Sequence, residues 1–289
     1  MNNDLALDKR LLRRSFEKAA AGYDAAAVLQ HEICSRMLSR LDYIKQQPAT
    51  ILDAGSGTGN VVAELHARYP RAVLYALDIA LAMVRLARGR LPWWQRLLGR
   101  GVLSMCGDIE RLPVRTAAVG MVWSNLVLQW VNEPPRAFAE FRRVLAPGGL
   151  LMFSTFGPDT LKELRAAYQG IDSYTHFNRF IDMHDLGDML VHEGFADPVM
   201  DMEYLTLTYA DVRALMHDLK AMGAHNMTAG RRPGMTARAV LATVERNYET
   251  SRRDGRLPAT FEIVYGHAWV PQPRTTADGK PIIPIKVQG

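Results

Sequence analysis

The 289-residue sequence has little cysteine and no long hydrophobic run. Its two cysteines, Cys34 and Cys106, are too few for a disulfide framework and lack the spacing of a metal site, which fits a reducing compartment. No apolar run approaches the ~20 residues of a membrane-spanning helix. The first residues, Met1 to Asp4, show no charged-then-apolar secretory pattern. We therefore expect a cytoplasmic protein with no membrane span and no bound metal.

The composition is that of a globular protein with a surplus of positive charge. Hydrophobic residues make up 48% of the chain and charged residues 22%, and the length allows one large domain or a domain with a cap. The net charge is +5 and the isoelectric point near 9.3, which permits an acidic partner such as nucleic acid, an anionic membrane or an acidic protein. Scattered, solvated arginines would explain the same charge, so composition leaves these alternatives open.

One stretch, residues 50–60 (TILDAGSGTGN), organises the chain. Thr50 to Leu52 suit a buried strand, and Gly55, Gly57 and Gly59 permit a tight turn and the close approach of a ligand. Residues 60–69 then have the apolar spacing of an amphipathic helix. A strand, a glycine loop and a helix in this order present free backbone N–H groups at the carboxyl edge of a sheet.

Three kinds of ligand site compete for this loop. A dinucleotide site requires G-x-G-x-x-G, but here the third glycine comes one residue early. A phosphate-binding P-loop requires Lys and then Ser or Thr after the last glycine, where Asn60 stands. The remaining pattern, D-x-G-x-G-x-G with Asp53 at the strand end, is typical of class I S-adenosylmethionine (SAM) methyltransferases. A purely structural glycine turn is the alternative.

Strands and helices alternate from Ile51 to Phe156, which predicts a doubly wound, mostly parallel sheet. Two later strands, at about 200–209 and 260–270, would complete a seven-stranded, Rossmann-like class I methyltransferase fold with inserted helices. Two helices, at about 5–21 and 26–43, precede the sheet. The expected organisation is an N-terminal helical lid (1–47), a SAM-binding core (48–156), a C-terminal part that completes the sheet with substrate-side helices (157–270) and a tail (271–289).

Polar side chains follow the ends of the first four predicted strands. Asp78 lies about 20 residues past the glycine loop, where a carboxylate can accept both ribose hydroxyls. Asp108 can accept from an adenine amino group while Ile109 packs on the ring. Open α/β sheets bind ligands at this edge, so four stretches in this order predict SAM. The expected cofactor-binding residues are Asp53, Gly55, Ser56, Gly57, Asp78, Ile79, Met83, Asp108, Ile109, Asn125 and Leu126.

The expected reaction is attack by a nucleophile on the activated methyl group of SAM. A carboxylate nucleophile is already ionised at pH 7 and needs no general base, whereas a hydroxyl or amine usually does. The sequence shows no unambiguous acid–base constellation, so positioning and desolvation would carry catalysis. After the fourth strand the sequence reads Asn125-Leu126-Val127-Leu128 instead of the N-P-P-Y motif, which argues against methylation of nucleic-acid amino groups.

Several stretches together resemble one methyltransferase family. They are residues 19–23 (AAAGY), 52–59 (LDAGSGTG), 107–113 (GDIERLP), 124–130 (SNLVLQW), 178–180 (NRF), 218–224 (DLKAMGA) and 230–231 (GR). Over roughly residues 10 to 270, the chain resembles the malonyl-acyl-carrier-protein O-methyltransferases of biotin synthesis. The glycine motif is generic to methyltransferases, whereas residues 124–130 and the C-terminal stretches discriminate this family from others.

The resemblance implies a substrate and a partner. The family methylates the free carboxylate of a malonyl thioester on acyl carrier protein or coenzyme A (CoA). The methyl ester removes the negative charge, so that fatty acid synthesis can elongate the chain toward pimelate. The resemblance places Tyr23 near the substrate. It also suggests Arg179 and His225 as further catalytic candidates. The candidates for binding the substrate or docking an acidic carrier protein are Lys220, Arg231 and Arg232.

The sequence departs from the pattern of this family at two places, which leaves a second interpretation of the substrate open. The segment around Trp93 and Trp94 looks like an insertion relative to shorter family members. Residues 156–165 (FGPDTLKELR) resemble methyltransferase-fold assembly factors of respiratory complexes, at least one of which resembles a protein-arginine hydroxylase. The alternative function is therefore that of an assembly factor or a protein-arginine hydroxylase.

Overall fold

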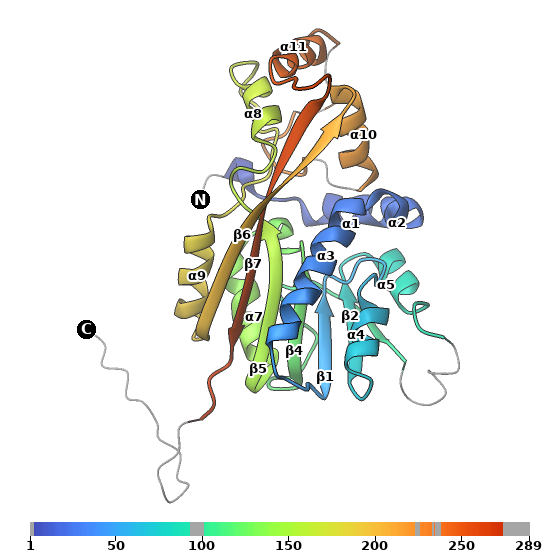
Figure 1. Ribbon diagram of the computed structural model, residues 1–289, viewed down its shortest axis with the longest axis vertical. Coiled ribbons are helices and arrows are strands. Elements are labelled where there is room, and N and C mark those ends of the chain that lie inside the picture. Colours follow the sequence, from blue (N-terminus) through green and yellow to red (C-terminus); the bar gives the residue numbers. More distant parts are fainter. Residues whose placement is uncertain (1–2, 93–100, 223–225, 233, 235–237, 274–289) are drawn as a thin grey trace, which may run out of the picture.

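The computed structural model describes residues 3–92, 101–222, 226–232, 234 and 238–273 (Figure 1). Trp93, Trp94, His225 and the tail from residue 274 lie outside the described residues. None of the helices within the described ranges is both long and apolar enough to cross a membrane.

A seven-stranded sheet forms the centre of the protein, with the strand order β3-β2-β1-β4-β5-β7-β6. β1 to β5 pair in parallel, whereas β7 runs antiparallel to both β5 and β6. The predicted doubly wound, mostly parallel sheet is thereby confirmed. The strands are β1 (Thr50–Ala54), β2 (Val73–Asp78), β3 (Leu103–Cys106), β4 (Val119–Asn125), β5 (Leu145–Phe156), β6 (Ala196–Tyr209) and β7 (Leu257–Trp269).

Helices cover both faces of this sheet (Figure 1). The α-helices of the described ranges are α1 (Lys9–Ala19), α2 (Tyr23–Ala26), α3 (Val28–Arg40), α4 (Val62–Arg68), α5 (Leu81–Ala87), α7 (Pro134–Val144), α8 (Lys162–Tyr168), α9 (Met183–His192), α10 (Val212–Ala221) and α11 (Arg238–Glu249). Short 3₁₀ turns are η1 (Asn3–Leu5), η2 (Ala20–Gly22), η3 (Leu41–Tyr43) and η4 (Leu128–Trp130).

The core has two layers because successive strand residues point to opposite faces of the sheet. In β1, Ile51 packs in the cluster that contains α3 and α4, whereas Leu52 packs in the cluster that contains α7 and α9. Both side chains are fully buried. This explains why the central strands read as continuous apolar runs rather than as alternating ones.

The N-terminal region is more broken than the predicted helix over residues 5–21. The helix α1 begins only at Lys9, because the Asp8 side chain accepts hydrogen bonds from the backbone N–H groups of Arg10 and Leu11 and so caps it. The turn η2 ends at Gly22, and the one-turn helix α2 follows. The N-terminal region is therefore divided into several short helical segments before α3.

The last two strands extend beyond the rest of the sheet. β7 pairs with β5 only from Ile263 to Trp269, but it pairs with β6 from Leu257 to Trp269. The free part of this two-stranded ribbon carries α8, α10 and α11 past the end of β5, on the side where α1 and α2 also lie (Figure 1). The N-terminal and C-terminal segments thus meet above the carboxyl ends of the parallel strands.

Candidate functional site

The glycine loop turns sharply after β1. The backbone N–H groups of Gly55 and Ser56 both donate to the Leu77 carbonyl, at 2.7 and 2.8 Å. Gly55 has φ +84°, and a Cβ there would overlap the side chain of Val127. Gly59 has φ +78°, and its Cβ would lie 2.8 Å from Cα of Ala87. Backbone conformation and space therefore both require glycine at these two positions.

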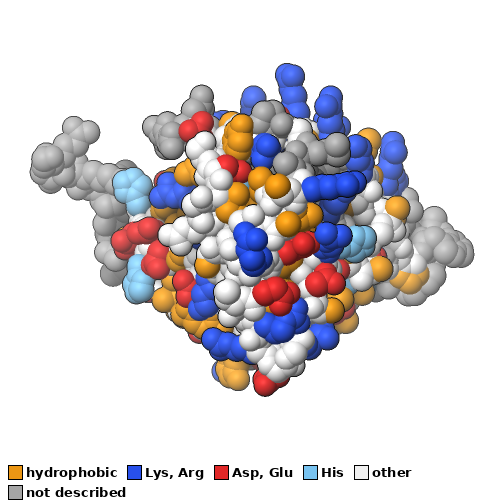
Figure 2. All heavy atoms as spheres, turned by 90° about the horizontal axis from the view of Figure 1, so that it is seen from above, with side chains coloured by type: hydrophobic (Ala, Val, Ile, Leu, Met, Phe, Trp, Pro, Cys, Tyr) orange, Lys and Arg blue, Asp and Glu red, His pale blue; other side chains and the backbone are white. Residues whose placement is uncertain are grey.

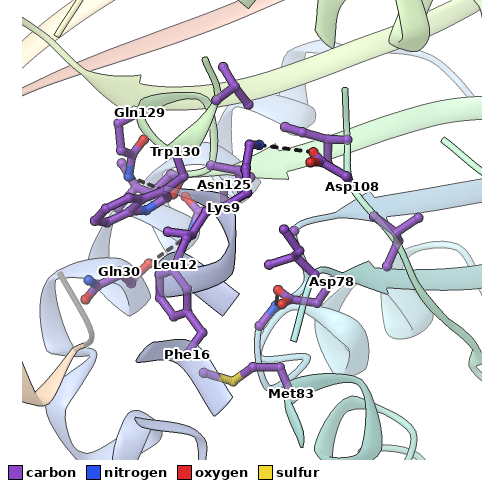
Figure 3. Close-up of a pocket in the computed structure, with 18 of the residues that line it drawn as sticks. Lys9, Leu12, Phe16, Gln30, Asp78, Met83, Asp108, Asn125, Gln129 and Trp130 are labelled. Carbon is purple, nitrogen blue, oxygen red and sulfur yellow. Dashed lines mark hydrogen bonds and ion pairs between the residues drawn. The ribbon is translucent and has the colours of Figure 1, made fainter. Parts of the chain in front are cut away.

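This loop faces a first cavity at the carboxyl ends of β1 to β4, where the strand order reverses between β1 and β4 (Figure 3). Such switch points are the usual ligand sites of open α/β sheets. Nine of the eleven predicted cofactor residues line it: Gly55, Gly57, Asp78, Ile79, Met83, Asp108, Ile109, Asn125 and Leu126. The other two, Asp53 and Ser56, do not line this cavity and are buried next to the loop.

The first cavity is narrow, at about 90 Å³, compared with roughly 300 Å³ or more for a typical small-molecule site. Leu12 and Phe16 of α1 and Met222, which follows α10, line it from the side opposite the strands. A ligand of nucleotide size would therefore require these segments to move outward.

Two buried carboxyl groups share the strand ends of this site. Asp78 accepts hydrogen bonds from the N–H groups of Gly57 (2.9 Å) and Ala80 (2.8 Å). Burial nevertheless raises the pKa of Asp78 to about 6. Burial, reinforced by the charge of Asp78, raises the pKa of Asp53 to about 8, and Oδ2 of Asp53 has no hydrogen-bond partner among the described residues. A cation bound next to these two carboxyl groups would stabilise their ionised forms.

A lysine that sequence analysis did not select ties the N-terminal helix to this site. Nζ of Lys9, the first residue of α1, lies 3.2 Å from Oδ1 of Asp108 (Figure 3). It also pairs with Glu110. Glu110 in turn accepts from the N–H groups of Asn132 and Glu133, at 3.1 and 2.8 Å. No motif marks Lys9, because its partners lie about 100 residues further along the chain.

Aromatic side chains also connect α1 with residues near the ends of the strands. The Phe16 ring contacts those of Tyr23 and Trp130 edge-on, with centroid distances of 6.5 and 5.5 Å. Tyr23 lines the first cavity and packs close to Gly57. Burial, together with the charges of Asp78 and Asp24, raises the pKa of Tyr23. Its phenol therefore stays protonated at neutral pH and can donate a hydrogen bond.

A second, wider cavity of about 710 Å³ adjoins the first. Gln129, Trp130 and Phe156 line both cavities and so form their shared wall. The rest of the second cavity is lined by aromatic, aliphatic and polar side chains, with Tyr168, Phe177, Phe180 and Phe261 as its further aromatic residues. Gln129 and Trp130 belong to the stretch 124–130 that carried the family resemblance, so a signal for them was present in the sequence.

The three predicted docking residues, Lys220, Arg231 and Arg232, all line this second cavity. Arg231 donates to the Thr228 carbonyl at 2.9 Å, and Arg232 lies 3.9 Å from Oδ2 of Asp172. The structure thus brings together three cations that come from two separate segments. Their side chains give the second cavity a positive charge, opposite to that of the first.

Two other predicted residues are not placed at a cavity. Arg179 is exposed and lines neither cavity, although its neighbours Asn178 and Phe180 line the second. His225 lies outside the described residues. A different histidine, His176, lines the second cavity, where its Nε2 lies 2.8 Å from Oδ1 of Asp172. Only the spacing of four residues between Asp172 and His176 hinted at this pair.

Comparisons with known proteins show the family of the chain. Residues 52–153 match a family described as "Methyltransferase domain". The malonyl-[acyl-carrier protein] O-methyltransferase of Gallionella capsiferriformans is 57% identical to this chain over 282 residues, which cover 97% of both chains. The enzyme of that name from Nitrosospira multiformis is 56% identical over 287 residues, covering 96% of this chain and 94% of its own.

The solved structures support the fold. A SAM-dependent methyltransferase from Thermotoga maritima superposes with a TM-score of 0.51 at 15% identity, covering 89% of this chain and 99% of that chain. At this identity the likeness concerns the fold alone. The names of the two sequence relatives favour a methyltransferase over the assembly-factor interpretation.

Proposed function

Because the chain belongs to the malonyl-[acyl-carrier protein] O-methyltransferase family, we propose that it methylates the free carboxylate of a malonyl thioester, with SAM as the methyl donor. The carrier would be acyl carrier protein or CoA. The product, a malonyl methyl ester, would prime the synthesis of a pimeloyl chain for biotin. The observation that carries this proposal is the contact between two cavities of opposite charge, which share the wall of Gln129, Trp130 and Phe156.

The first cavity fits SAM in its donor set. The glycine loop and the carboxyl group of Asp78 would hold the positively charged methionine part and the ribose, with Asp53 buried beside the loop. Ile79 and Ile109 would flank the adenine, with Asp108 as the acceptor for its amino group. When bound, SAM supplies a methyl group activated by a positively charged sulfur. The orphaned Oδ2 of Asp53 supports a cationic ligand, because an unpaired buried acceptor is costly.

The second cavity fits an anionic acyl substrate. Lys220, Arg231 and Arg232 would attract the carboxylate, the phosphate of a phosphopantetheine arm or the carrier itself. A malonyl carboxylate is ionised at neutral pH, so the reaction needs no general base. The aromatic wall would strip water from this carboxylate, which raises its nucleophilicity, while Tyr23 could donate a hydrogen bond without ionising.

The test is methyl transfer from labelled SAM to malonyl-acyl carrier protein, with acetyl-acyl carrier protein as the control that lacks the carboxylate. We expect label on the malonyl form only, and mild base should release it as methanol because the product is an ester. Base-stable label would indicate a different acceptor. No label, with SAM binding intact by calorimetry, would overturn the proposal and favour the assembly-factor alternative.

A further inference from the structure

Helix α1 separates its side chains into an inner and an outer face. Leu12 is 2% exposed, and it lines the first cavity together with Phe16. On the opposite face stand Arg10, Arg14 and Lys18, which are all exposed. They are spaced four residues apart, so they form one row along the helix. We call these three residues the cationic row.

None of the three side chains of the cationic row forms a salt bridge among the described residues, although the charges of Arg10 and Asp8 interact. Arg13, beside the row, lies 3.9 Å from Glu17. Glu17 also accepts from the backbone N–H groups of Leu81 (2.6 Å) and Ala82 (3.0 Å) at the start of α5. The one acidic residue of α1 is therefore engaged elsewhere. Like charges four residues apart destabilise a helix, and a row of negative charges on a partner would relieve this repulsion.

The N-terminal end of the row lies beside the second cavity. Leu11, next to Arg10, lines that cavity. The segment before α1 pairs with the loop that leads to Arg231: Asp8 N–H donates to the Met227 carbonyl at 3.1 Å, and Ala229 N–H donates to the Ala6 carbonyl at 2.8 Å. Viewed from this end of the molecule, many Lys and Arg side chains are exposed, with Asp and Glu side chains among them (Figure 2). The segment that carries Arg10 and the segment that carries Arg231 and Arg232 are therefore neighbours.

We propose that the cationic row is the docking surface for the protein part of the substrate, an acyl carrier that presents acidic residues along a helix. From Arg10 to Lys18 the row spans about 12 Å of helix, which suits a line of carboxylates better than a single phosphate. Docking there would place the arm of the carrier next to the second cavity. This inference rests on the proposed function and adds to it a surface that distinguishes the carrier protein from CoA.

The test compares Arg14→Glu with the wild type on two substrates, malonyl-acyl carrier protein and malonyl-CoA. Arg14 is at the centre of the row, and the substitution is on the exposed face. We expect KM for the carrier-bound substrate to rise at least tenfold, while KM for malonyl-CoA changes less than twofold. Added salt should raise KM of the wild type for the carrier-bound substrate more steeply than that of the variant, because an ionic contact is screened.

The matched control is Arg71→Glu. Arg71 is also exposed and without an acidic partner in the described part of the chain, but it precedes β2 at the amino end of the strands. The Arg71→Glu substitution changes the net charge by the same amount as Arg14→Glu. We expect the KM values for both substrates to stay within twofold of those of the wild type. Equal effects of Arg14→Glu on the two substrates, or an effect of Arg71→Glu as large as that of Arg14→Glu, would overturn the docking surface. Absence of methyl transfer by the wild type to either substrate would instead overturn the proposed function.

Discussion

The two cavities differ in how the chain builds them. Most residues of the first cavity follow directly on β1 to β4, so consecutive strand ends supply them in chain order. The second cavity takes residues from α1, η4, the end of β5, α8 and the segments before and after it, α10, the segment after α10 and β7. A cavity built from strand ends can be recognised in short sequence motifs, whereas one built from distant segments exists only after folding.

The cavities also differ in charge. The first contains the carboxyl groups of Asp78 and Asp108, the latter paired with Lys9, and lies next to that of Asp53. The second contains Lys220, Arg231 and Arg232. Under the proposed function the first would hold a cationic cofactor and the second an anionic substrate. Variants on the two sides should therefore affect the binding of one ligand and spare the other.

The largest effect should follow from Gly55→Ala. The left-handed conformation of residue 55 and the overlap of its Cβ with Val127 together cost about 2–5 kcal/mol, so we expect a lower melting temperature and loss of SAM binding by calorimetry. Gly22→Ala is the matched control, because nothing lies within 4 Å of its Cβ. If Gly55→Ala retained the affinity of the wild type for SAM, the glycine loop would not be part of the cofactor site.

Asp78→Ala should have the next largest effect, and on one cavity only. Loss of a charged acceptor is worth ~1.5–3 kcal/mol, which corresponds to a SAM affinity about 10- to 150-fold weaker. KM for the malonyl substrate, measured at saturating SAM, should change little because Asp78 does not line the second cavity. An unchanged dissociation constant for SAM would contradict the role given to Asp78.

A change of pH should have smaller effects, and these should be opposite for the stability of the ligand-free protein and for its affinity for SAM. The pKa values of Asp53 (about 8) and Asp78 (about 6) exceed 3.8, the ordinary value. Between about pH 4 and 8 the folded, ligand-free protein therefore binds more protons than the unfolded chain, and its free energy of unfolding should fall as the pH rises. A cationic ligand favours the ionised carboxylates, so SAM affinity should rise with pH, by less than tenfold per unit for each group.

Thermal unfolding and calorimetry across this pH range would measure both trends. Asp53→Asn removes the group with the higher pKa and should flatten the two curves above pH 6. Stability and SAM affinity that changed in the same direction with pH would show that these carboxyl groups do not control them.

The smallest effect should come from Arg232→Gln, which changes the second cavity. Arg232 is partly exposed and its pair with Asp172 is long, and contacts of this kind are worth about 0.2–1 kcal/mol. We expect KM for the malonyl substrate to rise about two- to fivefold, with the dissociation constant of SAM unchanged. A weaker affinity for SAM would mean that the second cavity also contributes to the cofactor site.

The sequence predicted the first cavity well. Nine of the eleven expected residues line it, because each lies within a few residues of a strand end and a parallel sheet brings such ends together. Asp53 and Ser56 do not line it, since the tight turn at Gly55 leaves them buried beside the loop. Lys9 and Phe16 were missed, because only folding brings α1 against the strands.

The second cavity was predicted less completely. Lys220, Arg231 and Arg232 were expected from the family resemblance, and they do line it. Arg179 was expected as well, but it lines neither cavity. His176 and the aromatic residues of the segment 168–180 carry no periodic or motif signal. Their position depends on the β6–β7 ribbon, which extends past β5.

The sequence by itself determined the order of strands and helices, the glycine turn and the acidic strand ends, because these depend on local periodicity and on conformations that few residues adopt. Only the tertiary structure decided the antiparallel position of β7 between β5 and β6, the contact of α1 with both cavities and the wall of Gln129, Trp130 and Phe156 between them. These features join residues far apart in the chain, and the packing of the folded core sets which of them meet.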